Sequence, residues 1–161
     1  MRKNLSYIWA TMLGVGYFPF ASGTAGSLAT IPLAFVLAYY WGFYGIIAGT
    51  IIVFFTGTLA SKEVLKYTKH DPSIIVIDET AGQLLSFAFV ANYLQSNSYS
   101  HVIWIYALGF GLFRLFDITK PQPARWADKK ILNAWGVMLD DIFAGVYAAI
   151  CLYILKKFLL F

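Results

Sequence analysis

The sequence predicts an all-α protein, a polytopic bundle of helices embedded in a membrane and forming one domain over residues 1–161. Three observations indicate this class. Hydrophobic residues make up 60% of the chain and charged residues only 12%, whereas soluble domains carry about 25% charged residues. The mean hydropathy is +0.68. The apolar residues are gathered in long segments, and 161 residues is a usual length for one domain.

The N-terminal segment, MRKNLSYIWATMLGVGYFPFASG, shares a basic start and an apolar stretch with signal peptides. Ser6, Thr11, Gly14 and Gly16 interrupt the stretch that a signal peptide keeps apolar. We therefore expect a half-buried amphipathic or re-entrant helix that leads into a loop.

Five further segments are apolar enough to be membrane spans, which predicts a bundle of about five spans. They are residues 27–41, 43–60, 74–94, 101–118 and 137–155. Trp41 and Gly42 mark a bend between the first two. A span needs about 20 apolar residues, with a range of about 17–25. Because several segments are near or below that range, we expect short or tilted helices.

The basic residues gather in alternate connections between these segments. They are Arg2, Lys3, Lys62, Lys66, Lys69, Lys120, Arg125, Lys129 and Lys130. The connections near 41–43 and 95–101 contain no Lys or Arg. The positive-inside rule makes the basic side cytoplasmic. Lys156 and Lys157 fall on the other side, where long side chains can reach the headgroups.

The same topology brings five carboxylates to the cytoplasmic face. They are Asp78, Glu79, Asp117, Asp140 and Asp141. Acids at helix N-termini gain about 0.3–1 kcal/mol from the helix dipole, which explains all of them except Asp117, at the end of its span. Ion pairs with nearby bases are the second explanation. Only three bases, Arg114, Lys120 and Arg125, lie nearby, so two acids stay unmatched. That excess suits a divalent cation, and ionisable residues at membrane depth indicate function.

Helical spacing predicts which side chains share a face. Glu79, Gln83 and Ser86 form one polar stripe. Asp141 shares its stripe with Gly145 and other small residues, which allow close helix approach. Asp141 is therefore favoured over Asp140 as a ligand. Oxygen ligands without His or Cys favour Mg²⁺ over Zn²⁺.

Two segments have the chemistry of a phosphate site. SGTAGS, residues 22–27, is a Gly-rich turn running into a helix, whose backbone N–H groups can bind an anion. It lacks the lysine of a Walker A loop, and it can also be only a flexible turn with a cap. FRLFDITKPQPARWADKK, residues 113–130, places basic side chains beside Asp117. For its last two lysines we prefer the interpretation of a positive-inside loop.

Four motifs together resemble the bacterial phosphatidylglycerophosphatase A family. They are GYFPFASGTAGSL, DPSIIVIDETAG, FRLFDITKPQPARWAD and GVMLDDIFAG, which cover about residues 14 to 150 in this order. The resemblance implies a small enzyme of the bacterial inner membrane that removes the terminal phosphate of phosphatidylglycerophosphate to give phosphatidylglycerol, with Mg²⁺ required. Its expected partner is a phospholipid substrate and not a nucleic acid; the oligomeric state stays open. Ser22 stands where the family usually has proline.

With this resemblance we expect one or two Mg²⁺ ions bound by Glu79, Asp117 and Asp141, with Asp78 and Asp140 as further ligands or as their supports. The expected phosphate-binding residues are Gly23, Thr24, Ser27, Arg114, Lys120 and Arg125. Lys120 would also neutralise charge in the transition state.

Other functions fit less well. A small transporter or channel could use the carboxylates as a cation path, but a path needs polar groups through the whole membrane depth. A headgroup phosphotransferase would need a nucleotide or alcohol pocket that the sequence does not reveal. A cysteine phosphatase would need its cysteine in a phosphate-binding loop, whereas Cys151 lies inside a span. The residues around His70 lack the basic motifs of histidine-dependent lipid phosphatases. A phosphoaspartate intermediate stays open.

Overall fold

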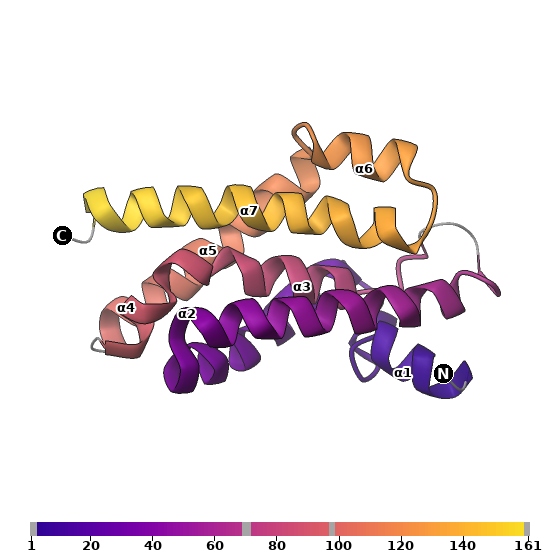
Figure 1. Cartoon of the computed structure of the whole chain (residues 1–161), viewed down its shortest axis with the longest axis horizontal. Helices are drawn as coiled ribbons and strands as arrows, with labels where there is room; N and C mark the ends of the chain where they lie inside the picture. Colours follow the sequence, from indigo (N-terminus) through magenta and orange to yellow (C-terminus); the bar gives the residue numbers. More distant parts are fainter. Residues whose placement is uncertain (1–2, 69–71, 97–98, 160–161) are drawn as a thin grey trace.

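The computed structural model describes residues 3–68, 72–96 and 99–159, and every regular element in these ranges is a helix (Figure 1). The elements are α1 Lys3–Ala10, η1 Val15–Tyr17, α2 Ser22–Val64, α3 Ile77–Ser86, η2 Ala88–Val90, α4 Ala91–Ser96, α5 Tyr99–Thr119, α6 Ala124–Lys130 and α7 Ala134–Leu159. The predicted all-α fold is confirmed.

The bundle is elongated, and its two ends differ. The N-terminus, α6 and the C-terminal end of α2 lie at one end in Figure 1, whereas α4 and the C-terminus lie at the other. Lys62 and the basic residues of α6 therefore share an end, as the grouping of basic connections predicted.

α2 is broken at Gly42 into two arms. Gly42 has φ 55° and ψ −138° inside the helix. A Cβ added at Gly49 would lie 2.5 Å from Cδ1 of Leu37, although twelve residues of straight helix would span about 18 Å. The arms, 22–41 and 43–64, are therefore antiparallel. The predicted bend is confirmed.

Side chains of α4 hold this bend. The Phe43 N–H donates a hydrogen bond to Oδ1 of Asn92 at 2.8 Å, and Nε2 of Gln95 donates to the Tyr39 carbonyl at 3.1 Å. Gly42 needs to be glycine because its φ is positive and an added Cβ would lie 2.5 Å from Oδ1 of Asn92.

The first arm of α2 begins earlier than predicted. Its first helical hydrogen bond runs from the Ala25 N–H to the Ala21 carbonyl at 3.1 Å, and Ser22 is the first helical residue. The predicted Gly-rich turn over 22–27 is therefore wrong as a turn. These residues form the start of the helix itself.

The third predicted span, 74–94, is not one continuous helix. The chain leaves α3 after Ser86 and passes through η2 into α4. The fully buried Phe87 ring lies 4.9 Å from the Tyr106 ring between centroids, and a Cβ on Gly109 would overlap it. The helix thus breaks where Phe87 packs onto α5, a tertiary contact that a hydropathy pattern does not contain.

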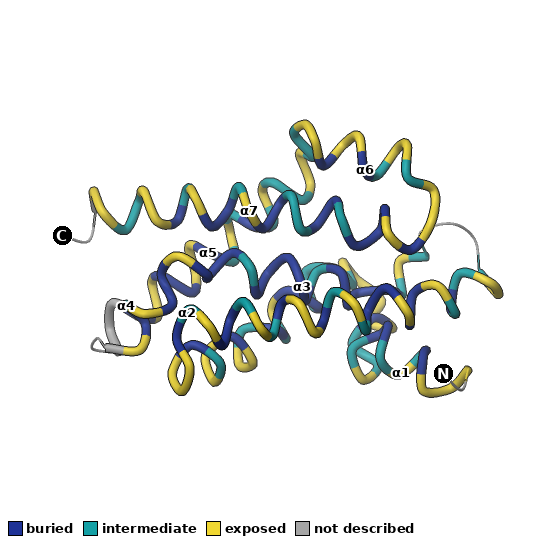
Figure 2. Tube along the Cα trace, in the orientation of Figure 1, coloured by how far each residue is buried: buried dark blue, intermediate teal, exposed yellow. Residues whose placement is uncertain are grey.

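α3 lies at the centre of the bundle and is mostly buried (Figure 2). It crosses α7 at two glycines: a Cβ on Gly145 would overlap the Gly82 carbonyl oxygen, and a Cβ on Gly82 would lie 2.5 Å from the Asp141 carbonyl oxygen. The two backbones therefore touch. This confirms that the small residues on the Asp141 stripe allow close approach.

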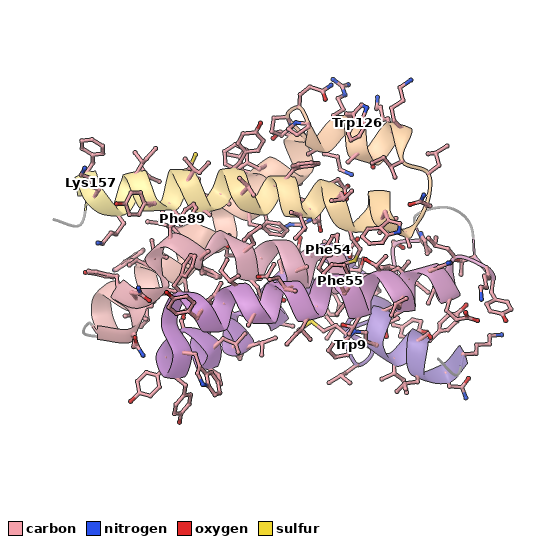
Figure 3. All side chains as sticks on the ribbon, viewed as in Figure 1. Trp9, Phe54, Phe55, Phe89, Trp126 and Lys157 are labelled. Atoms are coloured by element: carbon pink, nitrogen blue, oxygen red, sulfur yellow. The ribbon has the colours of Figure 1, made fainter. Side chains whose placement is uncertain are left out.

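Three described helices are long and apolar enough to cross a membrane: α2, residues 102–119 of α5, and residues 134–158 of α7. The predicted number of five spans is therefore not confirmed. Large apolar side chains such as Phe89 and Trp126 lie on the outside, half-exposed (Figure 3). α1 packs beside the second arm of α2, where Nε1 of Trp9 donates to Oγ1 of Thr56 at 3.0 Å.

Candidate active site

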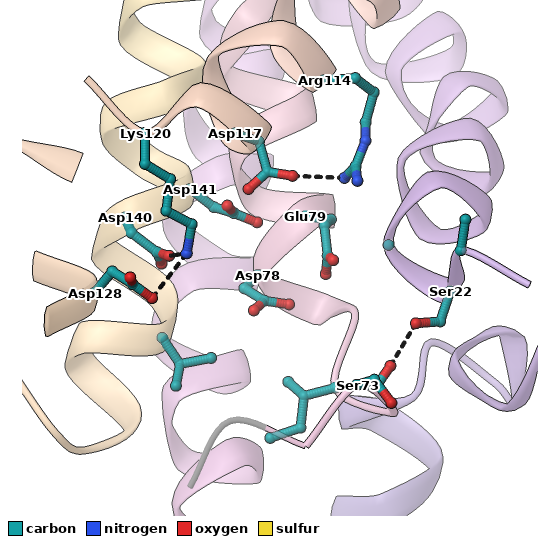
Figure 4. Close-up of a pocket in the computed structure, with 14 residues that line it drawn as sticks. Ser22, Ser73, Asp78, Glu79, Arg114, Asp117, Lys120, Asp128, Asp140 and Asp141 are labelled. Atoms are coloured by element: carbon teal, nitrogen blue, oxygen red, sulfur yellow. Dashed lines mark hydrogen bonds and ion pairs between the residues drawn. The ribbon is translucent and has the colours of Figure 1, made fainter. Parts of the chain in front are cut away.

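One cavity, of about 270 Å³, is lined by residues from five helices and three connecting segments. Its lining residues are Ala21, Ser22, Gly23, Ser73, Ile75, Asp78, Glu79, Arg114, Asp117, Lys120, Asp128, Val137, Asp140 and Asp141 (Figure 4). All five predicted carboxylates are among them. Segments far apart in sequence thus bring their charged side chains to one place, as the topology predicted.

Three carboxylates form a tight cluster at its centre. One oxygen each from Asp78, Glu79 and Asp141 lie within 4.8 Å of one another. Asp78 is 7% and Asp141 3% exposed. No described residue hydrogen-bonds Oε2 of Glu79, which is buried. Three like charges this close repel one another unless protons or a cation compensate them.

The backbone explains why this cluster forms. Asp78 and Glu79 lie in the first turn of α3, and the glycine crossing brings that turn to Asp141 on α7. Asp140 and Asp141 lie two turns into α7, which begins at Ala134. The helix dipole acts mainly within the first turn. The helix-cap explanation therefore does not apply to this pair.

Arg114 stands on one side of the cluster (Figure 4). Its Nη1 contacts Oδ2 of Asp117, three residues farther along the same helix, at 2.7 Å. The same nitrogen donates to Oγ of Ser27 at 3.4 Å, and Ser27 donates to the Gly23 carbonyl at 2.8 Å. Asp117 thus orients Arg114, and Ser27 links Arg114 to the start of α2.

Lys120 stands on the opposite side. Its Nζ lies 2.7 Å from Oδ2 of Asp140 and 2.8 Å from Oδ1 of Asp128. Partial burial alone would lower the pKa of Lys120, but the hydrogen bonds to Asp128 and Asp140 raise this pKa above its usual value. Lys120 is therefore a fixed positive charge at neutral pH.

The start of α2 adds backbone donors. No side chain caps this helix, and the helix itself does not use the N–H groups of its first three residues. Two of these residues, Ser22 and Gly23, line the cavity. A Cβ on Gly23 would overlap Oε1 of Glu79. Only glycine thus lets the helix start approach the carboxylate cluster this closely.

Not every predicted residue reaches the cavity. Thr24 is half-buried outside it, Ser27 is buried behind Arg114, and Arg125 is exposed on α6. Sequence reasoning missed Ser73, whose carbonyl accepts a hydrogen bond from Oγ of Ser22. It also missed Asp128.

The cavity carries six carboxylates and two basic side chains, an excess of four acids. Neither His nor Cys is among its described lining residues. Cys151 lies farther along α7, and His70 lies outside the described residues. The site thus offers oxygen ligands for a hard cation, flanked by donors for an anion.

Comparison with known proteins identifies the family. The model of the family Phosphatidylglycerophosphatase A matches residues 8–156. The chain is 35% identical to phosphatidylglycerophosphatase A of Haemophilus influenzae, over 98% of this chain and 92% of that protein. It is 34% identical to phosphatidylglycerophosphatase A of Escherichia coli, over 94% and 86% of the two chains.

A third relative bears a different name. It is a Bacteroides thetaiotaomicron protein called "Putative phosphatidylinositol-3-phosphatase", 33% identical over 94% of both chains. No solved structure matches the chain. The family match over nearly the whole chain, together with these relatives, shows that the protein is a phosphatase that belongs to the phosphatidylglycerophosphatase A family.

Proposed function

We propose that the protein hydrolyses the terminal phosphate of phosphatidylglycerophosphate, with Mg²⁺, to give phosphatidylglycerol and phosphate in phospholipid biosynthesis. The observation that carries this proposal is the cavity itself: the cluster of Asp78, Glu79 and Asp141 lies between Arg114 and Lys120. The names of the relatives from H. influenzae and E. coli support the substrate.

The residues present fit Mg²⁺. We assign the metal to Asp78, Glu79 and Asp141, because their oxygens converge and Oε2 of Glu79 is buried without a hydrogen bond from the described residues. Asp117 and Asp140 each contact a basic side chain and would orient it. Bound Mg²⁺ would polarise the phosphoryl group and lower the pKa of a bound water.

The chain's own donors would hold the phosphate. Arg114 and Lys120 supply two positive charges on opposite sides of the cluster, and the N–H groups of Ser22 and Gly23 supply the donors of a helix start. In hydrolysis, water oxygen bonds to phosphorus, the bond from phosphorus to the glycerol oxygen breaks, and a proton ends on that oxygen. The basic groups would stabilise charge as this bond breaks.

We propose further that the protein crosses the bacterial inner membrane several times and opens its site to the cytoplasm. The basic residues at the end of the bundle shared by α6 and the C-terminal end of α2, such as Lys62 and Lys129, favour that side. In this proposal the cavity would lie at headgroup depth, and the acyl chains would stay against exposed apolar side chains such as Ile118.

A transporter with a carboxylate cation path is the alternative. The described carboxylates that line the cavity do not continue along α3. Farther into the bundle Gln83 hydrogen-bonds Ser86, and the fully buried Leu84 and Phe87 follow. Membership of a phosphatase family also favours hydrolysis.

The proposal is tested with purified protein in detergent. Phosphatidylglycerophosphate and phosphatidylinositol 3-phosphate are supplied separately, and inorganic phosphate is measured with Mg²⁺, with chelator and after Mg²⁺ is restored. We expect faster release from the glycerol lipid, dependent on Mg²⁺. Faster release from the inositol lipid would overturn the substrate, and release that survives the chelator would overturn the metal. No release from either lipid would overturn the proposed function.

Gly23→Ala is expected to lower kcat/KM by about 10²-fold, because displacing a catalytic group by about 1 Å has an effect of this size. The new methyl group would push away the Glu79 carboxylate. The free energy of unfolding should change little, since only the end of the flexible Glu79 side chain needs to move. The measurements are phosphate release and the melting temperature; a variant with the wild-type rate would contradict the close approach.

A further inference from the structure

We propose that Asp128 is a positioning residue, which holds the ammonium group of Lys120 in the direction of the substrate phosphate. This inference rests on the proposed function and adds to it a residue, and a role for the short helix α6. Asp128 lies on α6, lines the cavity and contacts Lys120 at 2.8 Å.

The geometry of the ammonium group is the first argument. An ammonium group has three N–H donors in a tetrahedral arrangement. Asp128 and Asp140 accept two of them, at 2.8 and 2.7 Å. Two fixed donors set the direction of the third. One carboxylate alone would leave the group free to rotate about a single contact.

The charge of the cavity is the second argument. Its six carboxylates outnumber its two basic side chains, so the ammonium group of Lys120 is attracted toward the acidic cluster. Asp128 comes from α6, whereas Asp140 and Asp141 are neighbours on α7. Without Asp128, Lys120 would keep only a partner that lies next to the cluster, and it would move toward the metal ligands. Asp128 therefore holds the positive charge away from them.

The surrounding structure fixes the backbone of Lys120 in an unusual conformation. Lys120 has φ 44°, in the left-handed region that a residue with a Cβ rarely adopts. Such a conformation persists where the surroundings determine it. Its N–H donates to the Phe116 carbonyl at 2.9 Å and so continues α5. The Tyr147 hydroxyl donates to the Gln122 carbonyl and ties the next residues to α7.

α6 presents Asp128 to this lysine. Ala124 and Ala127 are fully buried, and α6 packs along the start of α7 (Figure 1). The opposite face, with Arg125 and Trp126, is exposed. The buried alanines therefore fix the helix, and Asp128 follows directly after the second of them.

Asp128 adds little to stability by itself. The side chains of Lys120 and Asp128 are 28% and 30% exposed, and partly exposed ion pairs contribute little to folding. A large loss of activity on changing Asp128 would therefore come from the site and not from unfolding.

The test is Asp128→Asn in the full chain in detergent, with phosphatidylglycerophosphate and Mg²⁺. We expect kcat to fall about tenfold. KM should stay within about twofold, because Arg114, the metal and the helix start still bind the phosphate. The Mg²⁺ concentration for half-activation and the melting temperature should not change. Asp128→Glu should recover part of kcat, because it restores the carboxylate.

Two comparisons separate positioning from other effects. Glu63→Gln removes an acid from the ion pair with Lys66, outside the cavity, and should keep the wild-type rate. On a Lys120→Ala background, Asp128→Asn should change kcat less than twofold, since a residue that acts through Lys120 has no effect without it.

An unchanged kcat for Asp128→Asn would overturn the inference. So would an equal loss on the Lys120→Ala background, or a lowered melting temperature that accounts for the loss of activity. A wild-type protein that releases no phosphate would overturn the proposed function, and this inference with it.

Discussion

Asp141→Asn is expected to lower kcat for phosphate release by at least about 10³-fold, because it removes a metal ligand and a charge from the centre of the site. Asparagine keeps the shape of the side chain. Asp141 is 3% exposed and shares its space with Asp78 and Glu79. The measurement is phosphate release from phosphatidylglycerophosphate across a range of Mg²⁺ concentrations.

The same change is expected to stabilise the metal-free protein. Without a cation, the three carboxylates repel one another, and burial adds to the unfavourable energy of each charge. Removing one charge should raise the free energy of unfolding by roughly 1 kcal/mol, or the melting temperature by about 2–4 °C. Mg²⁺ at 100 times its dissociation constant would stabilise the wild type by about 2.7 kcal/mol, and this gain should disappear in the variant.

Asp117→Asn is the matched control for stability. Asp117 is also a carboxylate of the cavity, but it contacts Arg114 at 2.7 Å. Its removal leaves a partly buried guanidinium group without its charged partner, so the melting temperature should fall. If Asp141→Asn also lowers it, or keeps Mg²⁺-dependent turnover, the metal role assigned to Asp141 is wrong.

The sequence predicted the parts of the fold that depend on local pattern. Gly42 follows a run of aromatic residues and marks the bend, and the small residues around Asp141 indicate close packing on α7. Alternating basic connections placed the acids of three helices at one end, and the cavity contains all five of them. Charge and helical spacing carry this information without any knowledge of contacts.

The sequence did not contain what depends on tertiary contacts. The helix breaks after Ser86 because Phe87 packs onto α5. The ion pair between Lys120 and Asp128 depends on how α6 folds back onto α7. Asp128 precedes two lysines, so in sequence it resembles one charge of a basic loop. Arg125 has the residue type of a phosphate ligand but lies on the exposed face of α6. A helix of seven residues has too weak a pattern to show which face is buried.

Gly82→Ala is expected to destabilise the fold and inactivate the site together. A Cβ at this position would lie 2.5 Å from the Asp141 carbonyl oxygen and 2.5 Å from Cε2 of Phe113. The first contact is with backbone, so α3 and α7 must separate. Overpacking of this kind lowers the free energy of unfolding by about 1–3 kcal/mol. Because Glu79 and Asp141 lie on the two separated helices, kcat should fall by about 10²-fold or more.

Gly145→Ala reaches the same crossing from the other helix, where its Cβ would overlap the Gly82 carbonyl oxygen, and should have the same two effects. Gly111→Ala on α5 is the control: nothing lies within 4 Å of its added Cβ, and alanine should stabilise the helix by about 0.5–1 kcal/mol. Melting temperatures and phosphate release in detergent check all three.

A Gly82→Ala variant that is unstable but fully active would show that the helix separation does not set the distance between the carboxylates. Since both glycines lie within four residues of a cluster carboxylate, we expect packing and activity to be lost together.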